Sequence, residues 1–239
     1  MSQKKSFAIH ALELGPMENF IHIVHDFETG SAAVVDPAWD VPTILDSVDK
    51  LEARVTDILL THSHRDHVNG VDELREASGA NLHIHEAEYA FWAQKPENTT
   101  LHQDGDQVRI GATTFTWIHT PGHTPGSSCF YFPDHLITGD TLFVYGCGRC
   151  DLPGGSPESM FNALERLKGM PKKTIIHPGH NYSIQTTSTI EEEIVGNPFM
   201  HWEDLEAFTR YRLVEHERTR QSPYGPITKS DLKAAGLMQ

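Results

Sequence analysis

The residues best suited to chemistry are crowded into one stretch, THSHRDH at positions 61–67, which directly follows an apolar run at 58–60. The possible metal ligands in it are His62, His64, Asp66 and His67. Histidine is the commonest metal ligand in proteins, and this chain contains 16 of them. Side chains two apart in an extended stretch point to the same side, so His62 and His64 are expected to face one ion. The stretch therefore predicts a metal site at the end of a strand.

Three further ligand-type residues repeat this arrangement. His123 follows a predicted strand at 113–120, Asp140 follows an apolar run at 136–138, and His180 follows a predicted strand at 174–178. A glycine directly precedes each of them, and glycine permits the sharp turn that this arrangement needs. Strand ends from distant parts of the chain can meet at one edge of a sandwich. We therefore expect these three residues to join the 61–67 cluster.

Together these residues make seven ligands, which is more than one ion requires. A catalytic zinc ion commonly takes three protein ligands and a water molecule, so seven fit two ions when one carboxylate is shared. Imidazole and carboxylate groups suit zinc, our preferred metal, and also iron or manganese. Two divalent ions roughly 3.5–4 Å apart would hold a shared water as hydroxide, a strong nucleophile. The predicted chemistry is therefore metal-assisted hydrolysis.

The composition narrows the class of protein. The 239 residues include 19 Lys and Arg against 33 Asp and Glu, and the resulting net charge of −14 argues against a nucleic-acid or membrane surface. No apolar run approaches the roughly 20 residues that span a bilayer, and the N-terminus lacks a signal-peptide pattern. Three cysteines make a poor disulfide framework and indicate a reducing compartment. We expect a cytoplasmic protein that acts on a small molecule.

Alternating strands and helices must position the ligands. Period-two or continuous apolar patterns predict strands, and apolar residues three to four apart predict helices. Strands are predicted at 20–26, 31–37, 55–63, 81–86, 107–111, 113–120, 127–132, 135–139 and 174–178, and helices at 41–53, 69–79, 86–93 and 156–170. From residue 188 the pattern is helical and charged to the end. This order predicts an α/β or α+β sandwich, with a main domain at 1–187 and a helical segment at 188–239 packed on it.

The order and spacing of the ligands resemble the metallo-β-lactamase superfamily over about residues 18–182. HSHRDH at 62–67 resembles its H-x-H-x-D-H signature, and the three later ligands resemble its remaining ones. The resemblance implies a four-layer αββα sandwich with a short C-terminal helical appendage and with the metals at one edge of the two sheets. It implies one ion on His62, His64 and His123, a second on Asp66, His67 and His180, and Asp140 bridging. Asp66 and Asp140 are the carboxylates predicted to take part in catalysis.

Further segments resemble the glyoxalase II group of that superfamily: TPGHTPG at 120–126, GDTLF at 139–143, GCGR at 146–149, GHNY at 179–182, STIEEE at 188–193 and NPFM at 197–200. These enzymes hydrolyse S-acylglutathione thioesters, which implies attack of the hydroxide on the thioester carbonyl. Arg149 and Tyr182 match positions that contact the glutathione part of the substrate. Two departures bear on this substrate: Asp151 stands where the group has an aromatic residue, and the spacer at 181–187 is short.

The segment GCGRCD at 146–151 also resembles the persulfide dioxygenase group, which uses a single iron(II) and O₂ to oxidise glutathione persulfide. Its ligands match His62, His123 and Asp140, a two-histidine-one-carboxylate triad used by non-haem iron. Both ligand sets are present, so ligand identity leaves this alternative open. Gly179 and Phe199 stand where the dioxygenases generally have Ala and Arg, which favours the hydrolase. Other esters, lactones or phosphoesters, and a non-catalytic metal-binding role, are weaker alternatives.

Several other reactive residues are expected to be structural. Cys147 and Cys150 form a C-x-x-C pair without a second pair or a thioredoxin-like context, which favours a packing role. Asp36 ends a predicted strand, where it would either support a ligand histidine or form a plain turn. The arginines of the last helical segment are expected on a solvated helix face: Arg210, Arg212, Arg218 and Arg220.

Overall fold

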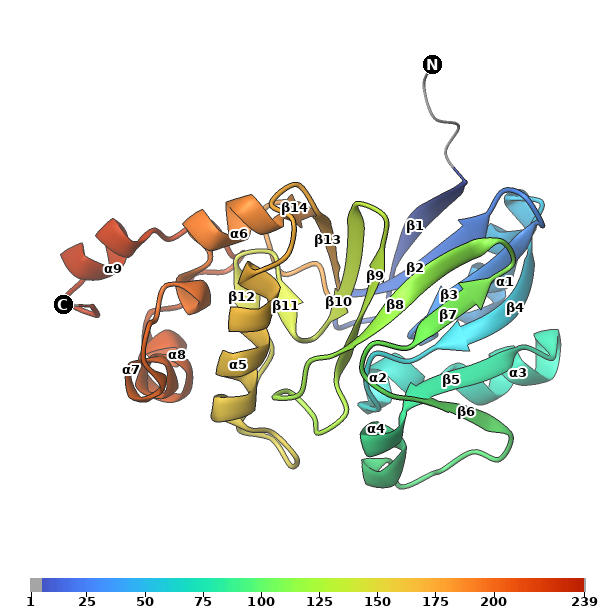
Figure 1. Ribbon diagram of the computed structural model, residues 1–239, viewed down its shortest axis with the longest axis horizontal. Coiled ribbons are helices and arrows are strands. Elements are labelled where there is room, and N and C mark those ends of the chain that lie inside the picture. Colours follow the sequence, from blue (N-terminus) through green and yellow to red (C-terminus); the bar gives the residue numbers. More distant parts are fainter. Residues whose placement is uncertain (1–5, 239) are drawn as a thin grey trace, which may run out of the picture.

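The computed structural model describes residues 6–238, and over this range two six-stranded sheets lie face to face (Figure 1). The first sheet has the order β1-β2-β3-β4-β5-β6, formed by Phe7–Leu14, Asn19–Asp26, Ser31–Val35, Arg54–Leu59, Asn81–His85 and Thr99–His102. The second has the order β14-β13-β10-β9-β8-β7, formed by Ser188–Thr189, Ile175–Pro178, His135–Gly139, Ser128–Phe132, Thr113–His119 and Gln107–Ile110. A small ribbon joins β11 (Leu142–Phe143) and β12 (Gly146–Cys147).

Helices cover the outer faces of both sheets, which gives four layers (Figure 1). On the side of the first sheet lie α1 (Val41–Lys50), α2 (Arg65–Val68), α3 (Val71–Ser78) and α4 (Glu86–Phe91). On the side of the second sheet lie α5 (Pro157–Lys168), α6 (Ile190–Gly196), α7 (Leu205–Arg210), α8 (His216–Thr219) and α9 (Lys229–Ala234). A 3₁₀ turn at Pro198–Met200 and a π-helical stretch at Tyr211–Glu215 connect the last helices. The predicted αββα sandwich is confirmed.

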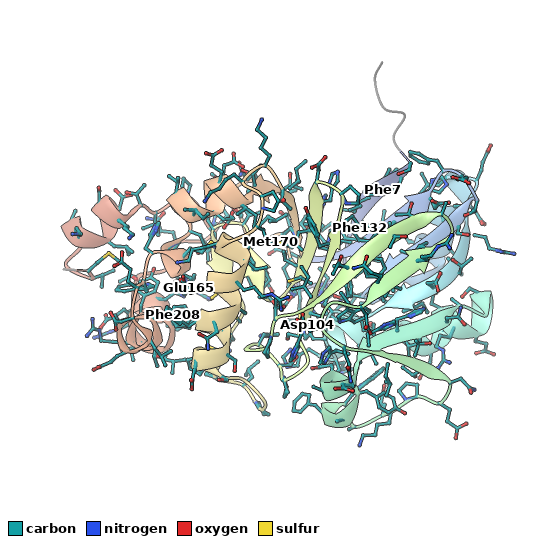
Figure 2. The ribbon with its side chains drawn as sticks, viewed as in Figure 1. Phe7, Asp104, Phe132, Glu165, Met170 and Phe208 are labelled. Carbon is teal, nitrogen blue, oxygen red and sulfur yellow. The ribbon has the colours of Figure 1, made fainter. Side chains whose placement is uncertain are left out.

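Three groups of buried apolar side chains fill the spaces between the layers. Between the sheets, Leu59 of β4 packs with Trp117 and Phe130 of the second sheet. The group outside the first sheet includes residues of α1 and α3, and the group outside the second sheet includes residues of α5. Phe208 of α7, labelled in Figure 2, lies beside α5, and its ring centroid is 5.5 Å from that of Phe161. Each layer is therefore held by its own apolar contact surface.

The sequence patterns located most elements, including the edge strand β7 (Gln107–Ile110), but missed the other edge strands of the two sheets. β1 and β6 were not predicted, although β1 pairs with β2 over its whole length. Both are edge strands with half-exposed or polar residues, so their own patterns are weak and their partners define them. The two-residue strands β11, β12 and β14 are too short to leave a periodic pattern. The predicted strand 55–63 ends at Leu59, because the chain there leaves the sheet to form the loop that carries the first ligands.

The strands that carry the candidate ligands end at one edge of the sandwich. β10 and β13 run parallel, and Gly139 pairs with Pro178, so Asp140 and His180 leave the sheet next to each other. Gly139 has a φ of +48°, and a Cβ there would overlap the side chain of Thr61, so this crossing requires glycine. Parallel pairing and close packing therefore bring distant segments to one place.

The segment after residue 187 begins as part of the second sheet, because β14 pairs with β13. Its first helix starts with a capping box in which Thr189 and Glu192 satisfy each other's backbone N–H groups. The division into units at 1–187 and 188–239 stays a prediction.

Within residues 6–238, no helix combines the length and the apolar character needed to cross a membrane.

Candidate metal centre

The structure brings all seven predicted ligands to one site. His62 and His64 lie in the loop after β4, Asp66 and His67 on the short helix α2, and the others after β8, β10 and β13. His64 Nδ1 and His123 Nε2 are 2.8 Å apart, and His67 Nε2 and His180 Nε2 are 3.1 Å apart. The ring centroid of His62 is 4.2 Å from that of His67 and 4.8 Å from that of His123.

The ligand atoms form two groups with one carboxylate between them. In each group the atoms lie within 4.8 Å of one another; the groups are His62, His64 and His123, and Asp66, His67 and His180. Asp140 reaches both groups, with Oδ2 3.4 Å from His123 Nε2 and 3.4 Å from His180 Nε2. Its Oδ1 is 3.4 Å from His67 Nε2. This geometry can accommodate two ions and a shared carboxylate.

Unpaired atoms at the centre indicate that these residues fit a metal. Within residues 6–238, His62 Nε2 and Asp140 Oδ1 are buried without a hydrogen-bond partner, which is costly unless something else satisfies them. Burial holds the pKa of His62 well below its usual value and also lowers the pKa of His123. Burial disfavours ionised Asp140, but the surrounding histidines hold its pKa well below the usual range. Neutral imidazoles and an ionised carboxylate are the forms that bind metal.

Positive charge is favoured at the second group. Burial disfavours the charged form of His67, yet Asp140, Asp36 and Asp66 raise its pKa well above the usual value. Burial also opposes ionisation of Asp66, but hydrogen bonds from His67 and Asn19 lower its pKa. Three carboxylates around one buried point stabilise a cation there, as a bound metal ion would require.

Neighbouring groups hold three of the ligand rings, those of His67, His123 and His180, by the nitrogen that faces away from the centre. The partners of Nδ1 are the Arg149 carbonyl for His123 at 2.6 Å, the Met17 carbonyl for His180 at 2.8 Å, and Asp36 Oδ2 for His67 at 3.1 Å. A ring that donates from Nδ1 leaves the lone pair of Nε2 free for a metal. Of the two alternatives for Asp36, support of a ligand histidine or a plain turn, this direct contact with His67 favours the first.

Asp36 also groups with His62 and His67 as a third possible set of ligands. Its oxygens already accept from Thr61 N at 2.8 Å, Thr61 Oγ1 at 2.6 Å and His67 Nδ1. Because these donors occupy the carboxylate, we interpret Asp36 as orienting the loop and the ring rather than holding an ion.

Sequence reasoning missed two supporting residues, Asn19 and Glu88. Asn19 is buried, accepts from Trp39 Nε1 at 2.8 Å, and donates from Nδ2 to Asp66 Oδ2 at 3.0 Å. Glu88 is completely buried and accepts hydrogen bonds from Ser63 and from the loop that carries His123. Neither residue stands beside a ligand in the sequence, so no local pattern could have identified it.

A cavity of about 730 Å³ opens over the centre. It is lined by ligands, by the two predicted substrate contacts Arg149 and Tyr182, and by Arg212 and Arg220 of the C-terminal segment. The ring of Tyr182 stacks on that of His180, with the ring centroids 4.6 Å apart. The Arg149 side chain is 58% exposed and forms a two-point ion pair with Asp151 at 2.7 and 3.0 Å.

The expectation of a solvated arginine face is wrong for Arg212. This residue is only 3% exposed, donates from Nε to the Gly148 carbonyl at 3.1 Å, and lies over the ring of Phe199. The π-helical stretch at Tyr211–Glu215 shifts the helix face that a regular α-helix would present, and sequence periodicity does not reveal such a shift.

Cys147 and Cys150 are buried and unpaired, in agreement with a packing role.

The chain belongs to the metallo-beta-lactamase superfamily, whose family model matches residues 17–180. It is similar to a probable polyketide biosynthesis zinc-dependent hydrolase, BaeB, of Bacillus velezensis, with 35% identity over 84% of this chain and 89% of that protein. It is 41% identical to a hydroxyacylglutathione hydrolase of Cereibacter sphaeroides, over 70% of this chain and 64% of that enzyme.

Among solved structures, ETHE1 from Myxococcus xanthus superposes on the chain with a TM-score of 0.80. The sequences are 28% identical, and the match covers 96% of this chain and 99% of that one. The superposition therefore includes the C-terminal helices as well as the sandwich.

Proposed function

We propose that this protein is a metal-dependent hydrolase that cleaves a thioester such as an S-acylglutathione. The observation that carries the proposal is the pair of ligand groups joined by Asp140 at the floor of an open cavity. We assign His62, His64 and His123 to one ion, Asp66, His67 and His180 to the other, and Asp140 to both. Zinc is the proposed metal, supported by the zinc-dependent relative, with iron or manganese as alternatives.

Bound divalent ions would supply Lewis acidity and make a water molecule nucleophilic near neutral pH. The protein's own carboxylates orient the water and compensate the positive charge of the ions. Asp66, held by the hydrogen bond from Asn19, contributes negative charge beside the attacking water and is the carboxylate that we assign to its proton. Asp140 compensates positive charge at the centre and fixes the separation of the two groups.

Three arginines in the cavity wall are available to pair with an anionic thiol carrier. Arg212 is buried against the cavity, and Arg149 and Arg220 are exposed in it. Tyr182 adds an aromatic surface beside the ligands. These groups suit the carboxylates of a glutathione conjugate, in line with the similarity to a hydroxyacylglutathione hydrolase.

The proposed main domain at 1–187 and the segment at 188–239 both contribute to the cavity, since Arg212, Arg220 and Tyr224 come from the segment. We propose that they act as one unit. We also propose a cytoplasmic location, which the three unpaired cysteines support.

The test is a pair of assays on one preparation. Zinc-loaded protein is expected to hydrolyse S-lactoylglutathione faster than a β-lactam, measured as loss of the thioester. Iron(II)-loaded protein is offered glutathione persulfide while O₂ consumption is recorded. Absence of turnover across several acyl-glutathiones would remove the thioesterase proposal, and O₂ uptake in the second assay would support the mononuclear iron alternative on His62, His123 and Asp140.

A further inference from the structure

One carboxylate connects the two loops that carry the first group of ligands. Glu88 on α4 is 0% exposed, and its Oε1 accepts from Ser63 N at 2.8 Å and Ser63 Oγ at 2.6 Å. Its Oε2 accepts from Thr124 Oγ1 at 2.7 Å and Gly126 N at 2.9 Å. A buried carboxylate is stable only when its oxygens are satisfied, and here each oxygen receives two donors.

The donors to Glu88 lie next to the ligand histidines in the sequence. Ser63 stands between His62 and His64, and Thr124 directly follows His123. Oε1 therefore holds one ligand loop and Oε2 holds the other. Any shift of Glu88 changes the spacing between the two histidines of the first loop and the single histidine of the second.

The approach of the second loop to α4 leaves no room for a side chain. A Cβ at Gly126 would overlap the backbone nitrogen of Glu88. Glycine at this position permits the backbone of the His123 loop to touch the helix directly. The contact between α4 and the His123 loop therefore depends on the carboxylate of Glu88 and on the absence of a side chain at Gly126.

The second group of ligands is held by different neighbours. Asn19 donates to Asp66, Asp36 holds His67, and the Met17 carbonyl holds His180. These partners come from β2, the end of β3 and the β1–β2 turn, whereas Glu88 comes from α4. Asp36 is shared between the groups, because it also accepts from Thr61 beside His62, whereas the hydrogen bonds of the Glu88 carboxylate go to the two loops of the first group.

We propose that Glu88 is a positioning residue that sets the metal affinity of the His62, His64 and His123 group separately from that of the second group. This inference rests on the proposed binding of metal. Loss of an outer partner of metal ligands typically lowers affinity by about 10- to 100-fold. Glu88→Gln places an amide N–H group opposite N–H and O–H donors, where it cannot accept their hydrogen bonds. We therefore expect it to lower the metal affinity of the His62, His64 and His123 group by this factor.

The experiment is a stepwise zinc titration of metal-free protein against a chromophoric chelator. Glu88→Gln is expected to weaken one binding step by about 10- to 100-fold and to leave the other unchanged. Asn19→Ala is the reciprocal variant and is expected to weaken the other step. Glu88→Asp, which keeps the charge, should recover part of the loss.

Glu193→Gln is the matched control, because Glu193 is also 0% exposed and accepts from Ser188, Tyr145 and Asn197 away from the ligand loops. It should leave both steps unchanged. If Glu88→Gln does not fold, Ser63→Ala and Thr124→Val each remove one donor and should weaken the same step less. If the wild type binds two ions and Glu88→Gln weakens both steps equally, or neither step, the inference is overturned. If the wild type binds no ion, the proposed function itself is overturned.

Discussion

Asp36 illustrates how a residue that holds no metal can decide which atom of a ligand is available. It has a φ of +51°, a conformation that aspartate tolerates better than most residues. In this conformation its carboxylate reaches Thr61 and the Nδ1 of His67. The ring of His67 then presents Nε2 to the centre, so the orientation of the ligand depends on a neighbour 31 positions away.

Asp140 is the residue whose loss should affect both ions. Asp140→Ala removes the only carboxylate assigned to both groups, so we expect loss of most of the bound metal at both sites. Elemental analysis of the purified variant measures this, and circular dichroism verifies that it is folded. Retention of the full metal content would contradict the bridging assignment.

Arg149 and Asp151 make a second prediction at this scale. Arg149→Ala should raise KM for an acyl-glutathione by about two- to fivefold with little change in kcat, because an exposed charge contributes up to about 1 kcal/mol. Asp151→Asn should lower KM, because it releases the Arg149 side chain from its ion pair. Steady-state kinetics of the two variants check both directions. An unchanged KM in Arg149→Ala would remove this side chain from the substrate site.

At the scale of elements, α6 is attached to the cavity wall by a buried acid. Glu193 accepts from Tyr145 N of the turn between β11 and β12, and from Ser188 and Asn197 on either side of its helix. Burial raises the pKa of this carboxyl to about 7, so it takes up a proton in the folded state more readily than in the unfolded chain. The contact between α6 and the turn therefore depends on pH.

The sign of that dependence follows from proton binding. Between the usual pKa of 4.5 and about 7, the folded state binds more protons, so the free energy of unfolding falls as pH rises. The slope reaches at most about 1.4 kcal/mol per pH unit. Glu193→Gln should remove this component, measured by denaturant unfolding of metal-free protein at several pH values. The same slope in wild type and variant would contradict the raised pKa.

At the scale of the whole molecule, the centre joins segments of both sheets. Its ligands follow β4, β8, β10 and β13, so a bound ion is a link between the two halves of the sandwich. Binding to the folded state alone stabilises a protein in proportion to the logarithm of ligand concentration. Metal content should therefore control the stability of the entire sandwich.

Removal of metal should lower the melting temperature. An ion present at about 1,000 times its dissociation constant contributes about 4 kcal/mol, which corresponds to about 8–16 °C for a chain of this size. Calorimetry before and after treatment with a chelator, followed by addition of zinc, measures the loss and its reversal. Equal melting temperatures with and without metal would argue against a site that links the sheets.

The sequence by itself determined the donor types and the layered fold. Four possible ligands within six residues, and single ligands after glycine turns, carry a local signal because metal chemistry restricts which side chains can serve. Apolar periodicity likewise located the central strands and long helices, since burial on one face leaves a regular pattern. Edge strands such as β1 left little pattern, because pairing with a neighbour defines them.

Only the tertiary structure decided which residues support the ligands and what the cavity wall contains. Glu88 lies 25 positions from Ser63 and 36 from Thr124, and Asn19 lies 47 from Asp66, so no local pattern relates them. Arg212 became a buried cation through a π-helical stretch that sequence periodicity does not reveal. Hydrogen bonds between distant segments depend on how the chain packs, and packing is a property of the folded molecule as a whole.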